Sequence, residues 1–520
     1  MFLERRTLSP ILLVLSVAPS AWATPKITPS ISVTEQYTDN VGLTTNNEED
    51  SFIHQVSPGI SIEDSGAKTT YSADYKYKRS SYTNSAFDDR SENNLNASIN
   101  RYELNRTLNM FANARIQNVE TEVGQPTFGD GETGRERTET RTTSTGFNYS
   151  SGLRQYYDID SGALYRHSEN DNNHDNIDSI SGNLRIQNGK RFNHAFWDFG
   201  GNYSEDDKEN RKTISDGMVG VNLTQTLGVF VQGNHEENDL ASGSLFITDY
   251  WGAGVRLNRA NSSLSVAYNT YEKGGQGDQR HFVSVNASWN PTRRTSVSAG
   301  YSERFFGETY SLDLQHETRR FKQVLKYSDS VTDFTDADSV YGNAYFDCPL
   351  SAQSINECQL VQDPSTPVAS GTQRVQYGNI EFIFLNEKQR LNRNLSYTGV
   401  YKSGKSTITG NVIWNRSKTL DSLFASREYT TQLSGALSWN WKFGSRTDMT
   451  LSSTVREVED QETIGTTTKT TDYTQKVSIH RTFTQDLSGT LSYAYSDRRG
   501  EDSSDDVRES RISASVVASF

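Results

Sequence analysis

The side chains that most often carry chemistry are sparse in this sequence and form no recognisable catalytic motif. The chain has 8 His, scattered along its length rather than placed at a metal-ligand spacing. It contains no phosphate-binding loop, no His-Glu-x-x-His and no Gly-x-Ser-x-Gly. Acidic runs such as residues 502–506 match no EF-hand loop and are interpreted as solvated loop tips. We therefore predict no enzyme, and assign no catalytic residue, metal ligand or cofactor site.

The composition narrows the class of protein further. Only 33% of the 520 residues are hydrophobic, which is too few for one large soluble core. The chain is nevertheless 11% aromatic with 10 Pro, whereas a disordered polar chain is poor in aromatics and rich in proline. A β-rich protein that covers only one face of each strand fits both numbers. The net charge of -13 argues against a nucleic-acid partner.

Residues 1–23 have the organisation of a Sec signal peptide. Arg5 and Arg6 precede an apolar stretch at residues 8–17, and Ala21-Trp22-Ala23 has the small-x-small form of a cleavage site. The apolar stretch is too short to span a bilayer as a helix. We expect residues 24–520 to form one exported domain. Only a few residues then precede the first strand, so a plug of the size seen in siderophore receptors is not expected.

Cys348 and Cys358 are the two cysteines of the chain. In an oxidising compartment the simple interpretation is one disulfide that closes a small loop. Chain entropy gives such a loop roughly 2–3 kcal/mol of stabilisation. Two thiols alone make a poor zinc site, so we predict a structural role.

From Ile27 to the C-terminus, apolar and polar residues alternate with a period of two. In the last ten residues, for example, Ile512, Val516 and Phe520 fall on one face, and Arg511 and Ser515 on the other. Alternation of this length is typical of a strand with one apolar and one polar face. No stretch shows the spacing of three and four that an amphipathic helix requires.

The connections between these strands alternate between two kinds. Short turns are expected at residues 65–68, 188–191, 258–261, 290–293 and 403–406. Longer polar segments occur at residues 39–50, 119–137, 170–176, 205–212, 236–244, 459–471 and 497–506. Alternation of tight periplasmic turns with long extracellular loops is typical of outer-membrane barrels. We predict an all-β, transmembrane, antiparallel up-and-down β-barrel of about 24 strands (range 22–26) in the outer membrane of a Gram-negative bacterium.

Such a barrel is too wide for its own side chains to fill. Strand spacing and tilt imply a diameter of roughly 45–50 Å. The polar faces should therefore line a hydrated lumen, and two runs illustrate its chemistry. The expected lumen-wall residues in these runs are Asp74, Lys76, Lys78, Asn109, Asn113, Arg115 and Gln117. A wall rich in hydroxyl, amide and charged groups can bond a sugar polymer weakly at many points, although any water-facing wall has this character.

Residues 328–385 are the longest stretch without a clear strand pattern. They hold both cysteines together with Pro349, Pro364 and Pro367. We expect an irregular loop here, which either folds into the mouth as a constriction or covers it as a cap.

Aromatic residues mark the expected strand ends. Tyr side chains near the long loops and Trp side chains near the short turns predict two girdles at the membrane boundaries. The residues concerned include Tyr165, Tyr203, Tyr271, Tyr301, Tyr327, Tyr401, Trp289, Trp439 and Trp441. The terminal Phe520 is similar to the assembly signal of bacterial outer-membrane barrels. The expected partners are accordingly outer-membrane lipid, lipopolysaccharide and the barrel-assembly machinery.

Three segments resemble one known family. They are Ile-Thr-Pro-Ser-Ile-Ser-Val-Thr-Glu-Gln-Tyr-Thr-Asp-Asn-Val at 27–41, Gln-Val-Ser-Pro-Gly-Ile-Ser at 55–61 and Trp-Asn-Pro-Thr-Arg-Arg-Thr-Ser-Val at 289–297. They resemble the outer-membrane proteins associated with PEP-CTERM/exosortase systems. The resemblance implies a role in exopolysaccharide export or envelope assembly, with periplasmic export partners and a polysaccharide cargo. It assigns no site residue. The alternatives are a general diffusion porin and a structural or adhesive barrel without transport.

Overall fold

The computed structural model describes residues 25–520 except 46, 121–136, 152–153, 172–175, 193, 240–244, 274–278, 305, 333–337, 350–358, 362–371, 385–389, 420–426, 463–466 and 502–505. Apart from the one-turn 3₁₀ helix η1 (Leu104–Arg106), the regular elements of these residues are strands. The first nine strands are β1 (Lys26–Thr38), β2 (Ser51–Ser65), β3 (Thr69–Tyr82), β4 (Arg90–Glu103), β5 (Leu108–Glu120), β6 (Arg137–Ser150), β7 (Tyr157–Asn170), β8 (Asn176–Asn188) and β9 (Ala195–Asp206). The next nine are β10 (Arg211–Asn222), β11 (Leu227–Asp239), β12 (Leu245–Arg259), β13 (Ser262–Lys273), β14 (Gln279–Thr292), β15 (Thr295–Arg304), β16 (Gly307–Glu317), β17 (Phe321–Thr332) and β18 (Asp338–Pro349). The last nine are β19 (Gln359–Val361), β20 (Thr372–Phe384), β21 (Arg390–Ser403), β22 (Ser406–Thr419), β23 (Arg427–Lys442), β24 (Thr447–Glu462), β25 (Thr467–Thr482), β26 (Leu487–Arg499) and β27 (Val507–Ser519).

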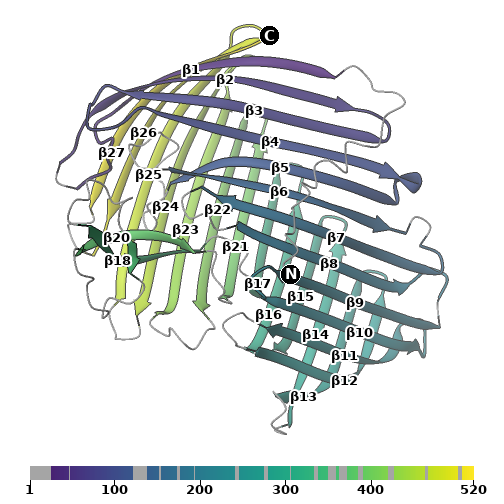
Figure 1. The fold of residues 1–520 in the computed structure, drawn as a ribbon. Coiled ribbons are helices and arrows are strands. Elements are labelled where there is room, and N and C mark those ends of the chain that lie inside the picture. The colour runs from purple at the N-terminus through teal and green to yellow at the C-terminus, as the bar shows by residue number, and fades with distance from the viewer. Residues whose placement is uncertain are drawn as a thin grey trace, which may run out of the picture.

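Twenty-four of these strands form one closed antiparallel ring. Each strand pairs with its neighbours in the chain from β1 to β17, β17 then pairs with β21, and the series continues to β27. The ring closes where β27 pairs with β1, over the register Ser30↔Ser519 to Thr38↔Arg511. The prediction of an up-and-down barrel of about 24 strands is confirmed. Figure 1 shows β1 to β4 crossing in front of the strands β22 to β27, and β9 to β12 crossing in front of β14 to β16.

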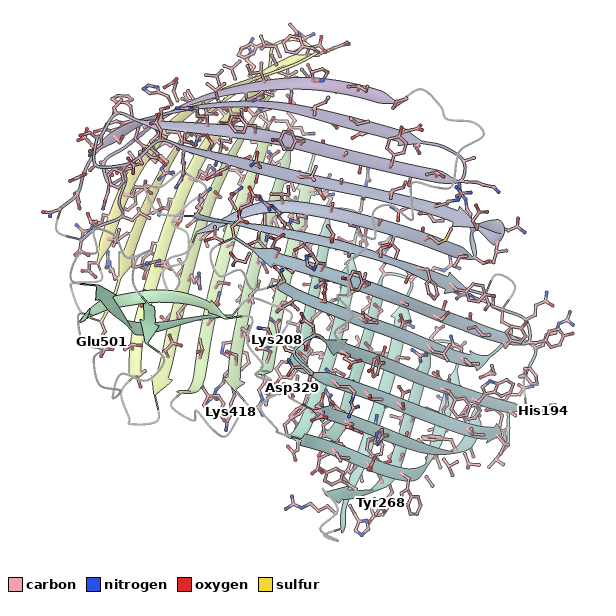
Figure 2. The ribbon with its side chains drawn as sticks, viewed as in Figure 1. His194, Lys208, Tyr268, Asp329, Lys418 and Glu501 are labelled. Atoms are coloured by element: carbon pink, nitrogen blue, oxygen red, sulfur yellow. The ribbon has the colours of Figure 1, made fainter. Side chains whose placement is uncertain are left out.

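The connections alternate between the two ends of the barrel as predicted. His194, which precedes β9, and Lys208, which follows it, lie at opposite ends of that strand (Figure 2). The predicted long loops are nevertheless shorter than expected, because their polar flanks belong to strands. β24 runs to Glu462 and β25 starts at Thr467, so most of the segment 459–471 is strand. Strands that project past the hydrocarbon can be polar on both faces, which is why their sequence resembles a loop.

Two observations identify the faces of the wall. Val231 and Trp251 are 60% and 70% exposed on one face of β11 and β12. On the opposite face of β11, Gln232 Nε2 reaches Ser284 Oγ of β14 at 3.2 Å, although β12 and β13 lie between them. Side chains of separated strands converge only on the inside of a curved sheet. The convex face is therefore apolar and the concave face is polar, in agreement with the predicted alternation.

The concave face holds a small apolar cluster, formed by Phe196, Phe230 and Ala267 with Met218 against them. Glycines on the same face make room for the rings. A Cβ on Gly254 would lie 2.6 Å from Phe230 Cζ, closer than a side-chain contact allows. The ring of Phe230 thus packs against the bare backbone of Gly254.

The described parts of the segment 328–385 are strands, contrary to the prediction of an irregular loop. β17 continues through Thr332 as a barrel strand, and β18, β19 and β20 form a separate three-stranded antiparallel sheet. The prolines were a misleading signal, since Pro349 is the last residue of β18, where a missing N–H is tolerated. The chain leaves the ring after β17 and returns to pair with it as β21. Its role as a constriction or a cap stays a prediction.

Candidate functional site

The strand register places the predicted wall residues on the concave face. Gln55 of β2, which is buried on that face, pairs with Ser80 of β3 and donates a hydrogen bond to it at 3.3 Å. Alternation along β3 then puts Asp74, Lys76 and Lys78 on the same side. Residues that pair directly across neighbouring strands share a face. The pairing of β3 with β4 and of β4 with β5 therefore places Asn109, Asn113, Arg115 and Gln117 on the concave face as well. Their part in transport stays a prediction.

Lys78 differs from the other predicted residues because it belongs to a charge cluster. Its Nζ lies 2.6 Å from Oε2 of Glu92, a nearly buried carboxylate on β4. Arg90 and Arg137 approach the same carboxylate at 3.4 and 3.2 Å. Sequence reasoning missed Glu92, although its alternation within β4 could have placed it inward. Asp74, Lys76, Asn113 and Arg115 remain exposed to the lumen.

The wall from β11 to β15 curls more tightly than a ring of this size requires. Gln232 of β11 donates to Asn269 of β13 at 2.7 Å as well as to Ser284, and Asn269 donates to Ser284 at 3.0 Å. Tyr250 of β12 meets Phe282 of β14 edge-on, with ring centroids 5.3 Å apart. These contacts bury amide and hydroxyl groups that a flatter wall would expose to water.

The longest-range contact of this curl is an ion pair. Arg304 at the end of β15 binds Glu236 of β11 through two nitrogens, with Nε to Oε2 at 3.0 Å and Nη2 to Oε1. The Glu236 side chain is 3% exposed and that of Arg304 26%. Alternation predicts that both face inward, but nothing in the sequence couples residues so far apart. We refer to this network from Gln232 to Arg304 as the curled wall.

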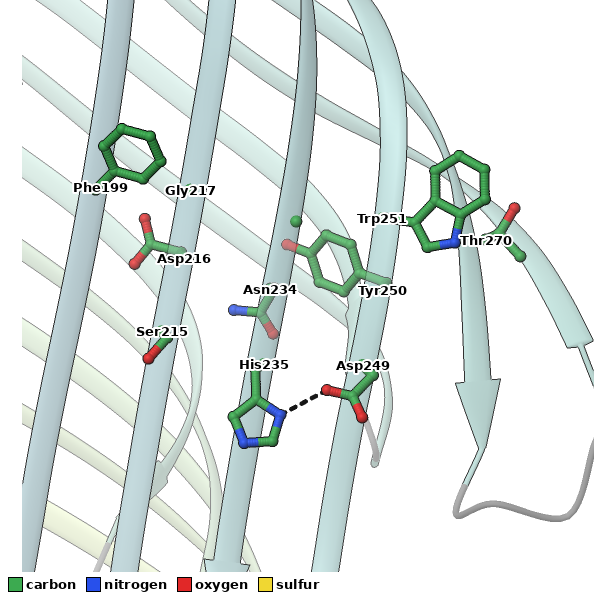
Figure 3. Close-up of a pocket in the computed structure, with 11 residues that line it drawn as sticks. Phe199, Ser215, Asp216, Gly217, Asn234, His235, Asp249, Tyr250, Trp251 and Thr270 are labelled. Carbon is green, nitrogen blue, oxygen red and sulfur yellow. Dashed lines mark hydrogen bonds and ion pairs between the residues drawn. The ribbon is translucent and has the colours of Figure 1, made fainter.

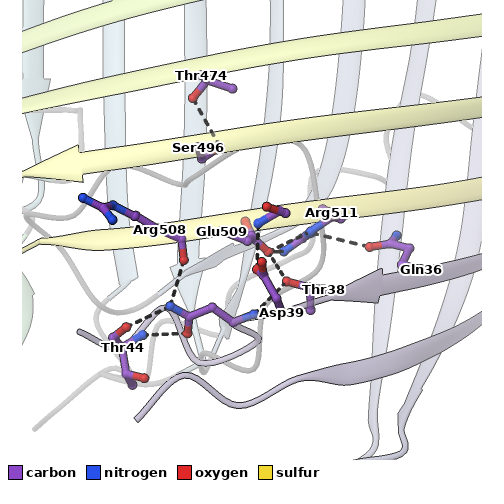
Figure 4. Close-up of polar contacts among 11 residues, drawn as sticks. Gln36, Thr38, Asp39, Thr44, Thr474, Ser496, Arg508, Glu509 and Arg511 are labelled. Carbon is purple, nitrogen blue, oxygen red and sulfur yellow. Dashed lines mark hydrogen bonds and ion pairs between the residues drawn. The ribbon is translucent and has the colours of Figure 1, made fainter. Parts of the chain in front are cut away.

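The seam between β1 and β27 is held by a second polar network (Figure 4). Glu509 accepts hydrogen bonds from Thr38 Oγ1 at 2.6 Å and from Arg511 Nε at 2.9 Å. Gln36 donates to Gln55 at 3.1 Å, which ties the seam to β2. Beyond the strand end, Asn40 donates to the carbonyl of Arg508 at 3.0 Å. The closing pair of strands is thus fastened by buried side chains in addition to its backbone ladder.

The predicted assembly residue completes the seam. The backbone N–H of Phe520 donates to the carbonyl of Pro29 in β1 at 2.9 Å, one step beyond the Ser30↔Ser519 pair. Its side chain is 76% exposed. An exposed terminal aromatic next to the closing strand pair leaves the ring accessible to a partner, and recognition by the assembly machinery stays a prediction.

The convex face has aromatic residues at both ends of its apolar band. Tyr165, Tyr203 and Tyr327 lie towards the long-loop end, where their hydroxyls donate to carboxylates at 2.6 to 2.8 Å. Trp439 and Trp441 stack beside a short turn, with ring centroids 5.7 Å apart. Two of the predicted girdle residues were wrong. Tyr271 is buried on the concave side, and Tyr401 lies by the short turn after β21 rather than by a long loop.

The predicted disulfide falls outside what the structure describes, because Cys358 lies in 350–358 and only the backbone of Cys348 is placed, within β18. Among the described residues, no three His, Cys, Asp or Glu side chains gather as a metal site would require. No helix of the described chain is long and apolar enough to cross a membrane.

In a closed antiparallel ring, the backbone N–H and C=O groups that cross the bilayer are hydrogen-bonded to neighbouring strands. Such a ring with an apolar convex face and a polar concave face is the architecture of an outer-membrane β-barrel. The protein is such a barrel, resides in the outer membrane of a Gram-negative bacterium and contacts its lipid and lipopolysaccharide.

No family model and no curated protein matches this chain. Solved structures similar to it include the siderophore receptor PirA from Acinetobacter baumannii, at 10% identity over 96% of this chain and 81% of that one, with a TM-score of 0.45. The FrpB iron transporter from Neisseria meningitidis is similar at 10% identity over 95% and 81% of the two chains, with a TM-score of 0.46. The siderophore receptor PiuA from Acinetobacter baumannii is similar at 8% identity over 96% and 82%, with a TM-score of 0.45.

Proposed function

We propose that this barrel is an outer-membrane channel for the export of an exopolysaccharide, working with a PEP-CTERM/exosortase-type envelope system. The observation that carries the proposal is the concave wall of the 24-stranded ring. It presents amides, hydroxyls and exposed charges, among them Asp74, Lys76, Asn113 and Arg115. Such groups exchange hydrogen bonds with water and with sugar hydroxyls at nearly equal strength, so a polymer can slide past them.

Several of the wall charges have an oppositely charged partner within the wall. Lys78 is paired with Glu92, and Lys326 of β17 lies 3.3 Å from Asp313 of β16. Paired charges hold an ionic cargo less firmly than isolated ones would. This favours passage of a neutral or weakly charged polymer over tight capture of a small ion. Energy and direction would come from periplasmic and inner-membrane partners, because the wall holds no nucleotide-binding motif.

The test is a deletion strain assayed for surface and secreted polysaccharide. We expect polysaccharide to be lost from the cell surface, to accumulate behind the outer membrane, and to return when the wild-type gene is restored. Uptake of small solutes, measured in the same strains, should change little. Unchanged surface polysaccharide would overturn the proposal. Reduced solute uptake with normal polysaccharide would instead identify a diffusion porin.

A further inference from the structure

The convex face has a recess that the channel function does not use (Figure 3). Its volume is about 510 Å³. Gly217 of β10 and Gly233 of β11 form its floor and are directly opposed in the sheet. Phe199, opposite Gly217 on β9, and Trp251, opposite Gly233 on β12, form its two walls. Two adjacent glycines thus remove one row of side chains from an otherwise covered surface.

The recess opens outward and not into the lumen. Trp251 and Phe199 are both exposed, as is Val231 two residues from Gly233 on the same face. Asp216, Asn234 and Tyr250 also line the recess, but they alternate with these outward residues along the strands and direct their side chains to the concave face. In a protein that spans the outer membrane, an outward apolar recess is bathed in lipid.

The neighbouring rows fix its depth in the bilayer. Towards the short turns, the next rows carry Val219, Val221 and Val255, all exposed and apolar. Towards the long loops, the next row is polar, with His235 Nδ1 and Asp249 Oδ1 2.6 Å apart. Still further out, Arg211 lies 3.2 Å from Glu237. The recess therefore sits at the outer edge of the apolar band, within the outer leaflet.

We propose that this recess binds an acyl chain of lipopolysaccharide, with the hydroxyl and amide groups at the head of that chain bonded to Asp249 and His235. The proposal rests on the outer-membrane location and is independent of the cargo. Phe199 and Trp251 lie on strands three spacings apart, about 14 Å. The Phe199 ring leans over Gly217, where a Cβ would lie 3.0 Å from its Cδ1, so the open floor is beside Gly233 and is one side chain deep. Flexible hydrocarbon fits such a shallow slot, whereas the convex wall of a second barrel would bridge it without filling it.

The polar edge of the recess, formed by His235 and Asp249, favours one kind of lipid over another. An ionised Asp249 only accepts hydrogen bonds, so it favours a lipid that offers donors at this depth. The hydroxyacyl amides of lipopolysaccharide offer O–H and N–H groups there. The glycerol esters of phospholipids offer only acceptors, which would leave Asp249 to water or to His235.

The test measures lipopolysaccharide retained per barrel after purification in mild detergent. Gly233→Leu should fill the slot, because its Cβ would meet only the Tyr250 carbonyl, at 3.6 Å. We expect it to retain about tenfold less lipopolysaccharide, the equivalent of about two buried methylene groups. The control is Gly435→Leu, an outward position of β23 whose Cβ would meet nothing within 4 Å. It should retain as much as the wild type.

Trp251→Ala, which removes one wall, provides a second variant should Gly233→Leu not fold, and heat-modifiability on a gel verifies that each barrel is closed. The proposal is overturned if folded Gly233→Leu or Trp251→Ala retains wild-type lipopolysaccharide. It is also overturned if the variants lose bound phospholipid in place of lipopolysaccharide. The same holds if Gly233→Leu dissociates an oligomer of the barrel without changing the amount of bound lipid.

Discussion

Arg304 and Glu236 form a two-point ion pair although β12, β13 and β14 lie between their strands. Measured along a flat sheet, four strand spacings would separate them by about 19 Å. The pair therefore shows that the wall folds back on itself at the long-loop end of β11 to β15. Together with Gln232, Asn269 and Ser284, it makes the curled wall a fixed part of the lumen outline.

Removal of one partner of this ion pair should lower the stability of the barrel strongly. In Arg304→Met, the carboxylate of Glu236 would stay buried without its guanidinium, a change that typically costs about 3–5 kcal/mol. We expect a matching loss in the free energy of unfolding, measured by urea denaturation of the barrel refolded in detergent or lipid. The double variant Glu236→Gln with Arg304→Met removes both charges and should recover at least about 2 kcal/mol of that loss. Equal destabilisation in the single and double variants would show that the charge pairing is not what matters.

The seam network predicts that Glu509→Ala destabilises the barrel more than Glu457→Ala does. Glu509, with a side chain 3% exposed, accepts a hydrogen bond from Thr38 across the closing strands and pairs with the nearly buried Arg511 of its own strand. Its loss should cost about 3–5 kcal/mol and lower the temperature at which the closed barrel opens on a heat-modifiability gel. Glu457→Ala removes a half-exposed ion pair with Lys469, 3.0 Å long, and should cost under about 1 kcal/mol. Similar losses in both variants would contradict the structural role given to the seam.

The face assignment predicts which charges affect permeating ions. Lys76 is exposed on the concave side of β3, while Arg79 of the same strand pairs with the outward Val56. Lys76→Glu should shift the reversal potential towards cations in a salt gradient across a planar bilayer, because a negative charge replaces a positive one at the water-filled wall. Arg79→Glu makes the same change in charge on the outer face and should leave the reversal potential where it was. A shift in the second variant alone would reverse the assignment of the two faces.

The predicted disulfide can be tested on the intact protein. We expect no reaction of Cys348 and Cys358 with a maleimide reagent in denatured protein that has not been reduced, and two additions after reduction. Cys348→Ser with Cys358→Ser should lose roughly 2–3 kcal/mol, the entropy that a small closed loop supplies. Labelling without a reductant would disprove the pairing.

The alternation of apolar and polar residues was enough to predict the number of strands and their two faces, because every barrel strand faces lipid on one side and water on the other. Asp74, Arg115 and Asn113 were placed inward on that basis alone. The same signal failed where its physical cause is absent. The segment around Glu459 is polar on both faces since it lies beyond the hydrocarbon, and it was read as a loop although it is strand. The Tyr271 prediction was wrong for a different reason, since alternation from the outward Tyr268 places Tyr271 on the concave face, where it is buried.

The contacts that define the lumen could not be predicted in this way. Alternation places Glu92, Glu236 and Arg304 inward but does not say which of them meet. Partners such as Glu236 and Arg304 are brought together by the curvature of the whole wall. Curvature is a property of many strands at once and leaves no local pattern in the sequence.

Single-channel recording of the refolded barrel in a planar bilayer tests most directly whether its polar concave face lines an open passage. We predict discrete conductance steps that grow in proportion to salt concentration, because the lumen is filled with water. A dextran added to one side should reduce these steps, because its sugar units can enter the lumen. A barrel that is closed by heat-modifiability and inserts into the bilayer, yet carries no current, would contradict the account.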